Sequence, residues 1–362
     1  MWPYLLLYII ALFCAFTDIL SVRNRWIVCG ILLVLMTTMA VFRDKLGGND
    51  FFMYSLYYKS AVPIRAYFEG KFVPEYHSKH FESGFAFVCC LIKTFDWTKG
   101  PYLLFAILTS FNFILFYKSL KKYTPYIFIA ILFYLYKGYF WHNFTLLRQS
   151  VSIALFMYSI QYLKDRKMTQ YMLINLIGFS FHHSAIILFP LYFILNKRYT
   201  TPSFIILMLI AIGCNISNTS STICMRLAEL SGLGNRLGVY MGENLRINPL
   251  NFIEILMITS VALFKRKNYE AEEPYFNIFL NMFVFSSLII LSLSSLEIFA
   301  RFKEYFVFAY MVLVSYMVGH IKNKKDQLLV FGGVALYVLV GYVRYLLIYD
   351  QGGLIPYKWI LF

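Results

Sequence analysis

Charged residues are scarce in this chain. Only 14% of its 362 residues are Asp, Glu, Lys or Arg, whereas 60% are hydrophobic and 20% are aromatic. A soluble domain carries about 25% charged residues. The composition therefore excludes a soluble protein and predicts a polytopic integral membrane protein.

Acidic residues are rarer than basic ones, with 18 Asp and Glu against 33 Lys and Arg, a net charge of +15. Basic domains often bind nucleic acid, but here the basic residues form short clusters between apolar segments. The positive-inside rule makes such clusters cytoplasmic, so we interpret the charge as a topology signal and expect no nucleic-acid partner. The clusters are Arg23/Arg25, Lys118/Lys121/Lys122, Lys164/Arg166/Lys167, Lys197/Arg198, Lys265/Arg266/Lys267 and Lys322/Lys324/Lys325.

Several motifs of common enzyme classes are missing. No G-x-x-x-x-G-K-[ST] occurs, which excludes a P-loop ATPase. The six cysteines show no C-x-x-C spacing, so neither a disulfide framework nor an iron–sulfur centre is expected. His77 and His80 are a rival zinc site, but zinc takes three or four ligands and no further Cys or His is suitably spaced. We therefore expect no metal and no cofactor.

Apolar segments between the basic clusters predict an all-α protein with about 12 transmembrane helices in a single membrane domain, residues 1–362. The first segment, Trp2 to Leu20, lacks a basic n-region and a small-residue cleavage site, so we interpret it as a retained span. With the clusters inside, both termini lie outside, as do two larger loops, 43–100 and 215–248, and two short segments, 141–148 and 295–300. The predicted spans are 2–20, 26–42, 101–117, 125–140, 145–163, 169–182, 184–196, 202–218, 249–264, 275–294, 298–319 and 327–347.

The first outer loop contains two further apolar segments, near 51–60 and 81–95. Counting 81–95 as a span would move the cluster at Lys118 to the outer face, and the segment is shorter than a bilayer requires. We therefore predict two helices that lie on the outer membrane surface.

Polar residues that can do chemistry gather on the predicted outer side. Charged residues near lipid are costly and mark functional sites. Two have competing interpretations: for Arg301, snorkelling of its side chain to lipid headgroups, and for His182, a helical turn capped through Ser184. The candidates are Arg43, Asp50, Tyr54, Glu82, Arg148, Gln149, His182, Arg236, Tyr240 and Arg301.

The order and spacing of these residues resemble a known family. The elements are Arg43, Gly48-x-Asp50-x-x-x-Tyr54, Glu82-x-Gly84-Phe85, Arg148-Gln149 and Phe181-His182-x-Ser184-Ala185. Together they resemble the EpsG/Wzy family of bacterial exopolysaccharide and O-antigen polymerases, over roughly residues 40–190. Arg236-x-x-x-Tyr240 and Arg301-x-x-x-Tyr305 are fainter similarities, and His183 departs from the pattern, so His182 takes the family position.

The resemblance implies a lipid-linked glycosyltransferase of the C superfamily type in the bacterial cytoplasmic membrane, with its active site on the outer face. Its donor and acceptor would be oligosaccharide repeat units on undecaprenyl pyrophosphate. The growing chain would join the non-reducing end of a fresh unit. A flippase and a chain-length regulator would be its partners.

The residues suit this chemistry. Asp50 is the candidate general base, and His182 is the competing one. Arg148 and Arg43 would bind the pyrophosphate, because a guanidinium donates bidentate hydrogen bonds to phosphate oxygens. A second clamp would come from Arg236 or Arg301, while Tyr54, Glu82, Gln149 and Tyr240 would bind sugar hydroxyls.

Two other functions stay open. A membrane O-acyltransferase would use His182 as its base but would face the cytoplasm. A flippase or transporter would need charges near the middle of the bilayer, where only Lys137, Lys303 and Arg344 come close.

Overall fold

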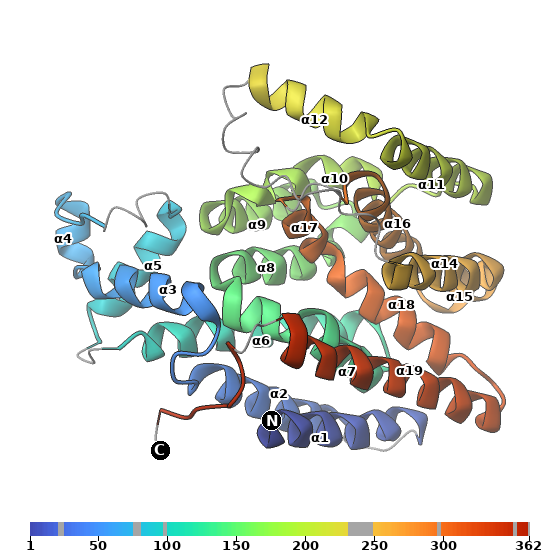
Figure 1. Ribbon diagram of the computed structural model, residues 1–362, viewed down its shortest axis with the longest axis horizontal. Coiled ribbons are helices and arrows are strands. Elements are labelled where there is room, and N and C mark those ends of the chain that lie inside the picture. Colours follow the sequence, from blue (N-terminus) through green and yellow to red (C-terminus); the bar gives the residue numbers. More distant parts are fainter. Residues whose placement is uncertain are drawn as a thin grey trace. The chain divides into compact units, whose positions relative to one another are not determined.

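The computed structural model describes residues 1–20, 25–74, 81–96, 100–230, 249–294, 298–349 and 353–360 (Figure 1). Helices make up 82% of it and no strand occurs in these ranges. An isolated antiparallel bridge joins Arg43 to Trp359. The predicted all-α fold is confirmed.

The chain divides into two compact units. Unit 1 comprises Met1–Phe189 and Val318–Phe362, and unit 2 comprises Pro190–Met317. The single membrane domain stays a prediction, and each unit is described by itself.

Unit 1 holds most of the candidate residues. The chain leaves unit 1 within α10 (Leu188–Ile194) and returns to unit 1 within α18 (Val307–Gly319). Its other helices are α1 (Trp2–Ile19), α2 (Arg25–Val41), α3 (Gly48–Ser60), α4 (Ile64–Phe68), α5 (Ser83–Lys93), α6 (Tyr102–Tyr123), α7 (Ile127–Tyr134), η2 (Leu135–Tyr139), η3 (Trp141–Thr145), α8 (Leu147–Lys164), α9 (Met168–Phe181), η4 (His183–Ile187), α19 (Lys324–Arg344) and η6 (Tyr345–Tyr349).

Unit 2 contains α11 (Thr201–Ile216), α12 (Thr219–Leu230), α14 (Pro249–Phe264), α15 (Arg266–Glu272), α16 (Phe276–Leu293), α17 (Ile298–Lys303) and η5 (Glu304–Phe306). An ionic cluster joins two of its predicted cytoplasmic loops. The Arg266 side chain donates to Glu270 at 2.6 Å and to the Tyr199 carbonyl at 2.7 Å, and Arg198 also pairs with Glu270.

Five described helices are long and apolar enough to cross a membrane: Trp2–Ile19, Tyr102–Tyr123, Phe276–Leu293, Arg301–Gly319 and Lys324–Leu347. The pair Thr201–Ile216 and Thr219–Arg226, bent by 75°, would make a sixth if it is one span. Helices also form at the other predicted spans, but several of them, such as α2 and α14, are shorter. The count of 12 spans is therefore not confirmed.

The basic clusters of unit 1 meet at one end of its helices. Lys122 Nζ donates to Gln161 Oε1 at 2.9 Å, and Lys324 Nζ donates to the Ile19 carbonyl at 2.8 Å. At the opposite end Tyr342 donates to the carbonyl of Tyr4, at 3.0 Å. The shared end agrees with the predicted topology.

The predicted placement of these clusters in loops is wrong in part: Lys118, Lys121 and Lys122 lie inside α6, and Lys324 and Lys325 lie in the first turn of α19. Long lysine side chains reach the polar region from the last helical turns, so the helix continues past the apolar segment.

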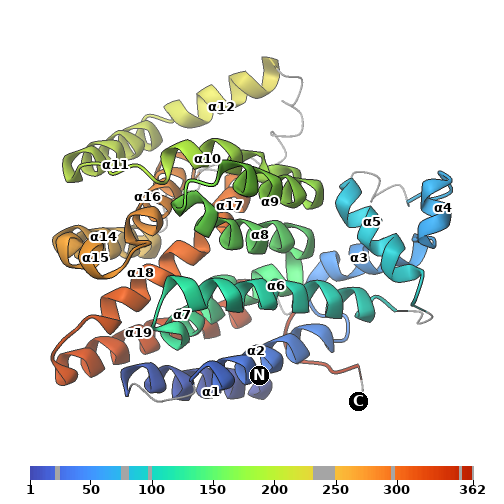
Figure 2. The ribbon, with the colours of Figure 1, turned by 180° about the vertical axis from the view of Figure 1, so that it is seen from behind.

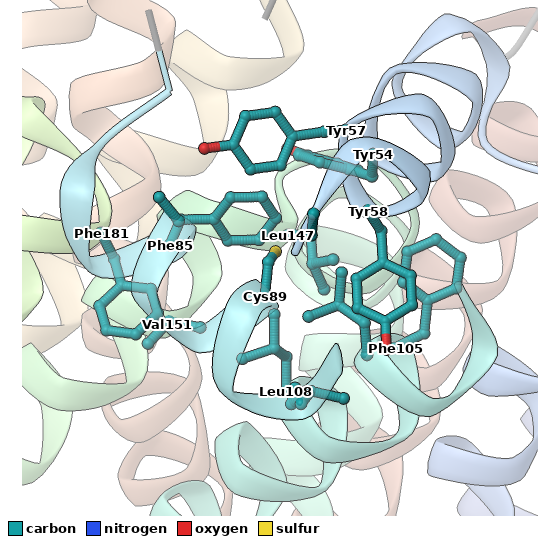
Figure 3. Packing of buried hydrophobic residues seen from close by; sticks show 14 of the residues in the cluster. Tyr54, Tyr57, Tyr58, Phe85, Cys89, Phe105, Leu108, Leu147, Val151 and Phe181 are labelled. Atoms are coloured by element: carbon teal, nitrogen blue, oxygen red, sulfur yellow. The ribbon is translucent and has the colours of Figure 1, made fainter. Parts of the chain in front are cut away.

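The described residues of the segment 43–100 (43–74, 81–96 and 100) form three helices, α3, α4 and α5, which lie together beside the first residues of α6 (Figures 1 and 2). Helices thus occur at both places predicted to carry surface helices. Their inner faces share one apolar cluster with α6, α8 and α9, in which Tyr57, Phe85, Cys89, Phe105 and Val151 are almost fully buried (Figure 3). This packing fixes α3 and α5 against α8, the helix that carries Arg148.

The residues predicted to form an outer loop at 141–148 are helical instead. Two π-helical segments, η2 and η3, continue α7 as far as Thr145, and α8 begins at Leu147. Inside them Asn143 Nδ2 donates to the Tyr139 carbonyl at 2.8 Å and to the Tyr134 hydroxyl at 3.1 Å. These hydrogen bonds give the buried Tyr139 carbonyl and Tyr134 hydroxyl a donor within the segment. π-Helical turns often occur at functional sites.

Candidate functional site

Glu82 is the centre of a polar cluster in unit 1. Its Oε2 pairs with Arg148 Nη1, and its Oε1 lies 2.9 Å from His182 Nδ1. The backbone N–H of His183 donates to the same Oε1, at 3.2 Å. The Glu82 side chain is only 5% exposed, while those of Arg148 and His182 are 17% and 14% exposed. Three separate parts of the sequence therefore meet at one buried carboxylate.

The close approach of α5 and α9 places Glu82 beside His182. Gly84 lies in the first turn of α5, where an added Cβ would lie 2.2 Å from Ser180 Oγ and 2.7 Å from the Ser180 carbonyl oxygen. Any side chain at position 84 would push the two helices apart. Glu82 precedes Gly84 by two residues and His182 follows Ser180 by two, so this contact explains the glycine of the Glu82-x-Gly84 motif.

His182 has extended backbone geometry at the C-terminal end of α9, with φ −158° and ψ 117°. Its N–H still donates to the Gly178 carbonyl, at 3.0 Å. Gly178 in turn packs on α8, where Ser152 Oγ donates to the same carbonyl at 2.6 Å. These contacts hold the end of α9 on α8 and direct the His182 ring toward Glu82.

Arg148 lies in the first turn of α8, and its guanidinium stacks on an aromatic ring. The Arg148 Cζ lies 3.8 Å from the centroid of the Phe81 ring. A cation over an aromatic face is stabilised by the ring quadrupole. The buried Nε of Arg148 has no hydrogen-bond partner among the residues that the structure describes. Phe81 and Glu82 thus hold the guanidinium while it keeps donor capacity for another ligand.

The electrostatics favour an ionised Glu82. Burial raises the pKa of this carboxyl, but the hydrogen bond from His182 and the positive charge of Arg148 outweigh burial and hold the pKa at about 2, against 4.5 ordinarily. Glu82 is therefore an anion at neutral pH and a poor proton acceptor. Its role in the cluster is to hold and orient two side chains.

Tyr54 reaches the same cluster from α3. Its hydroxyl donates to the Thr145 carbonyl at 3.2 Å, and its ring packs against those of Phe81 and Phe85. Burial raises the pKa of Tyr54, Arg148 lowers it and Asp50 raises it further. Asp50, in the first turn of α3, is thus close enough to act on the Tyr54 hydroxyl through its charge.

Arg43 is fully buried, and its contacts differ from those of Glu82. Its guanidinium donates to the carbonyls of Ala40, Leu46 and Phe144, and it lies over the Phe144 ring at 4.6 Å. These bonds support the backbone just before Thr145, the acceptor of Tyr54. Its predicted contact with pyrophosphate stays a prediction.

The remaining candidates lie elsewhere. Gln149 is buried in α8 next to Arg148. Arg301 is exposed in α17 of unit 2. Arg236 and Tyr240 are outside the described residues, as are His77 and His80. Among the described ranges no group of three or more His, Cys, Asp or Glu side chains is arranged to hold a metal.

Sequence reasoning missed three contributors: the Phe81 ring, the Ser180 contact of Gly84 and the His183 N–H. It placed Glu82 among sugar-binding residues, whereas in the structure the Glu82 carboxylate contacts Arg148, His182 and the His183 N–H. An aromatic residue directly before Glu82 and a glycine two residues after it were the available signals.

The arrangement can transfer a proton and bind an anion. When Nδ1 of His182 carries a proton, it donates to Glu82, which orients the ring and makes Nε2 the basic nitrogen. Arg148 supplies a fixed positive charge next to this ring. A proton acceptor and an anion-binding group therefore share one carboxylate.

A family model described as the EpsG family matches residues 26–359 of the chain. No curated protein and no solved structure matches it. The matched range includes Arg43, Asp50, Glu82, Arg148 and His182, so the resemblance inferred from these residues is confirmed. Because the match covers most of its length, the chain belongs to the EpsG family, which is associated in general with polysaccharide polymerisation in membranes.

Proposed function

We propose that this protein polymerises lipid-linked repeat units at the outer face of the bacterial cytoplasmic membrane. The donor is a glycan chain on undecaprenyl pyrophosphate, and the acceptor is the non-reducing end of a second lipid-linked repeat unit. Membership of the EpsG family supports this reaction class. The Arg148–Glu82–His182 cluster is the single observation that carries the site assignment.

In the reaction a hydroxyl of the acceptor sugar attacks the anomeric carbon of the donor. A new C–O glycosidic bond forms, and the bond from the anomeric carbon to the pyrophosphate oxygen breaks. The hydroxyl proton passes to a base on the protein, and undecaprenyl pyrophosphate leaves with the electron pair of the broken bond. The protein must therefore supply a proton acceptor and stabilise the departing negative charge.

His182 is our preferred base, acting through Nε2. Its partner Glu82 orients the ring and stabilises the imidazolium that forms, as the carboxylate does in Ser-His-Asp triads. Glu82 itself is too weak a base, since its pKa is held at about 2. Asp50 is the alternative base, because its charge acts on the Tyr54 hydroxyl and the Tyr54 ring packs against Phe81 of the cluster.

Arg148 stabilises the pyrophosphate as it leaves. Its guanidinium is positioned by Phe81 and Glu82, and charged hydrogen bonds to phosphate oxygens are among the stronger ones in proteins. Arg43 supports the backbone of η3 at Phe144. A direct contact of Arg43 with the pyrophosphate is part of the proposal. Arg236 or Arg301 would complete a second clamp, and Tyr240, Gln149 and Tyr54 would contact sugar hydroxyls.

Two substitutions test the base. Cells that lack the gene are complemented with His182→Gln or Asp50→Asn, and polymer length is examined on a gel. We expect His182→Gln to leave single repeats only and Asp50→Asn to retain polymer, with normal amounts of protein in the membrane. The reverse pattern would make Asp50 the base, and long polymer in both variants would refute the site. Glu69→Gln, at an exposed carboxylate that directly follows α4, is the control.

Labelling tests the side of the membrane. His183 is exposed next to the cluster, and Lys121 is exposed at the opposite end of unit 1. An impermeant thiol reagent added outside should modify His183→Cys and spare Lys121→Cys. Modification of Lys121→Cys alone would show that the cluster faces the cytoplasm, and it would favour the O-acyltransferase function.

A further inference from the structure

The segment 353–360, called the strap below, pairs with the loop that leads into α3 (Figure 1). The Ile360 N–H donates to the Phe42 carbonyl at 3.0 Å, and the Asp44 N–H donates to the Lys358 carbonyl at 2.9 Å. These two bonds flank the antiparallel bridge between Arg43 and Trp359. The strap thus forms the β-type pairing that fixes register through backbone groups.

Further bonds anchor the strap along its length. The Gly47 N–H approaches the Gly353 carbonyl at 3.4 Å. The Tyr357 hydroxyl donates to the Met39 carbonyl, and the Tyr4 hydroxyl donates to the Leu354 carbonyl, both at 2.7 Å. The strap is therefore tied to α1, to the end of α2 and to the loop at the same time.

The other face of the loop lies on η3. Gly47 has φ +109°, and a Cβ there would lie 2.5 Å from the Phe144 carbonyl oxygen. Arg43 Nη2 also donates toward this oxygen, at 3.4 Å. The loop 42–47 is thus held between the strap and the π-helical segment that ends just before Arg148.

The loop decides where α3 begins. Gly47 precedes the first residue of α3 and contributes no side-chain cap, so neighbouring backbone determines the position of the helix start. α3 carries Asp50 and Tyr54, and Tyr54 donates to the Thr145 carbonyl of η3. A shift of the loop would move both side chains relative to Arg148.

We propose that the strap is a positioning element of the transfer site. By pairing with the loop 42–47 it sets the start of α3 and thereby the place of Asp50 and Tyr54 against the Arg148–Glu82–His182 cluster. The proposal rests on the proposed function of that cluster. The strap acts through the backbone of the loop 42–47, so its residues are positioning residues.

Ile360→Pro tests the pairing at a single atom. Proline lacks the N–H that donates to Phe42 but retains an apolar side chain at a position that is 37% exposed. Ile360→Ala is the matched control, because it shortens the side chain and retains the N–H. Both variants are purified as full chains in liposomes and supplied with lipid-linked repeat units extracted from cells lacking this protein.

We expect kcat of Ile360→Pro to fall about ten-fold or more, because small displacements of positioned groups are costly to rate. KM should stay within about two-fold, since the groups that bind the lipid-linked units are retained. Ile360→Ala should retain wild-type kcat. A purely structural strap would lower the yield of folded Ile360→Pro and leave its kcat unchanged, which would overturn the proposal.

A disulfide gives a second measurement. Phe42 and Ile360 are hydrogen-bonded neighbours next to the bridge, and the two residues are 36% and 37% exposed. A Phe42→Cys/Ile360→Cys variant should form the bond on oxidation, since paired antiparallel residues suit disulfide geometry. The oxidised protein should retain activity. Failure to form the bond, or inactivity only when it is formed, would refute a fixed strap.

The strap and the cluster can fail separately. Activity in Ile360→Pro together with inactivity in Glu82→Gln would refute the strap and leave the proposed site intact. Activity in Glu82→Gln would refute the proposed site, whatever the strap variants do.

Discussion

Glu82 is the one carboxylate that holds both Arg148 and His182, and Glu82→Gln removes its charge with little change of shape. Arg148 and the His183 N–H bind different carboxylate oxygens, so the single amide oxygen of the variant can accept from one of them and its NH2 group faces the other. The amide also cannot neutralise the guanidinium. Leaving a buried charge without its partner is strongly destabilising.

The size of the effect follows from the pKa. A decrease from 4.5 to about 2 on folding corresponds to about 3 kcal/mol of stability at neutral pH. Because Arg148 is partly exposed, solvent screening brings the expected loss in Glu82→Gln down to about 2 kcal/mol. Since the pKa is lowered in the folded state, this stability is present above pH 4.5 and is lost as the pH falls toward 2.

The assay is equilibrium unfolding in mixed micelles from neutral pH to about pH 3, together with polymer formation at neutral pH. We expect the free energies of unfolding of wild type and Glu82→Gln to differ by a constant amount at neutral pH and to converge in acid. Polymer should be lost in the variant. Equal stability at neutral pH, or a difference that persists unchanged in acid, would refute the ionic role of Glu82.

Three further substitutions test other parts of the site. Gly84→Ala should destabilise by about 1–3 kcal/mol and abolish polymer, because its Cβ would clash with Ser180. Tyr54→Phe should lower kcat about ten-fold with a stability loss of about 1 kcal/mol, because one hydrogen bond is removed. Arg43→Met should reduce unfolding free energy by about 3 kcal/mol, since three carbonyls lose their donor, whereas Arg65→Met, at a side chain 92% exposed, should have almost no effect.

Unfolding in micelles measures the stability changes, polymer length on gels measures polymer formation, and turnover of lipid-linked repeat units in liposomes measures kcat. Gly213→Ala is the control for Gly84→Ala, because its Cβ would meet nothing within 4 Å. A fully active Gly84→Ala would show that α5 and α9 need not approach so closely. Unchanged kcat in Tyr54→Phe would remove Tyr54 from the site, and a stable Arg43→Met would contradict its supporting role.

Local composition predicted much of the fold. Low charge and long apolar segments identify membrane helices, and helices occur at all the predicted segments. The basic residues Lys122 and Lys324 lie at one end of unit 1, and the side of the membrane that this end faces stays a prediction. Helix ends were less predictable, because lysines can extend from a helical turn and π-helical turns can replace a loop.

The sequence by itself determined the class of protein, the places of its helices and the family to which it belongs, because these depend on composition and on short motifs. Only the tertiary structure decided what the motif residues do. Glu82 is 66 residues from Arg148 and 100 from His182, and no local preference specifies such pairs. The approach of α5 to α9 at Gly84 and the pairing of the strap with Phe42 arise in the same way, from packing between segments that are far apart in the chain.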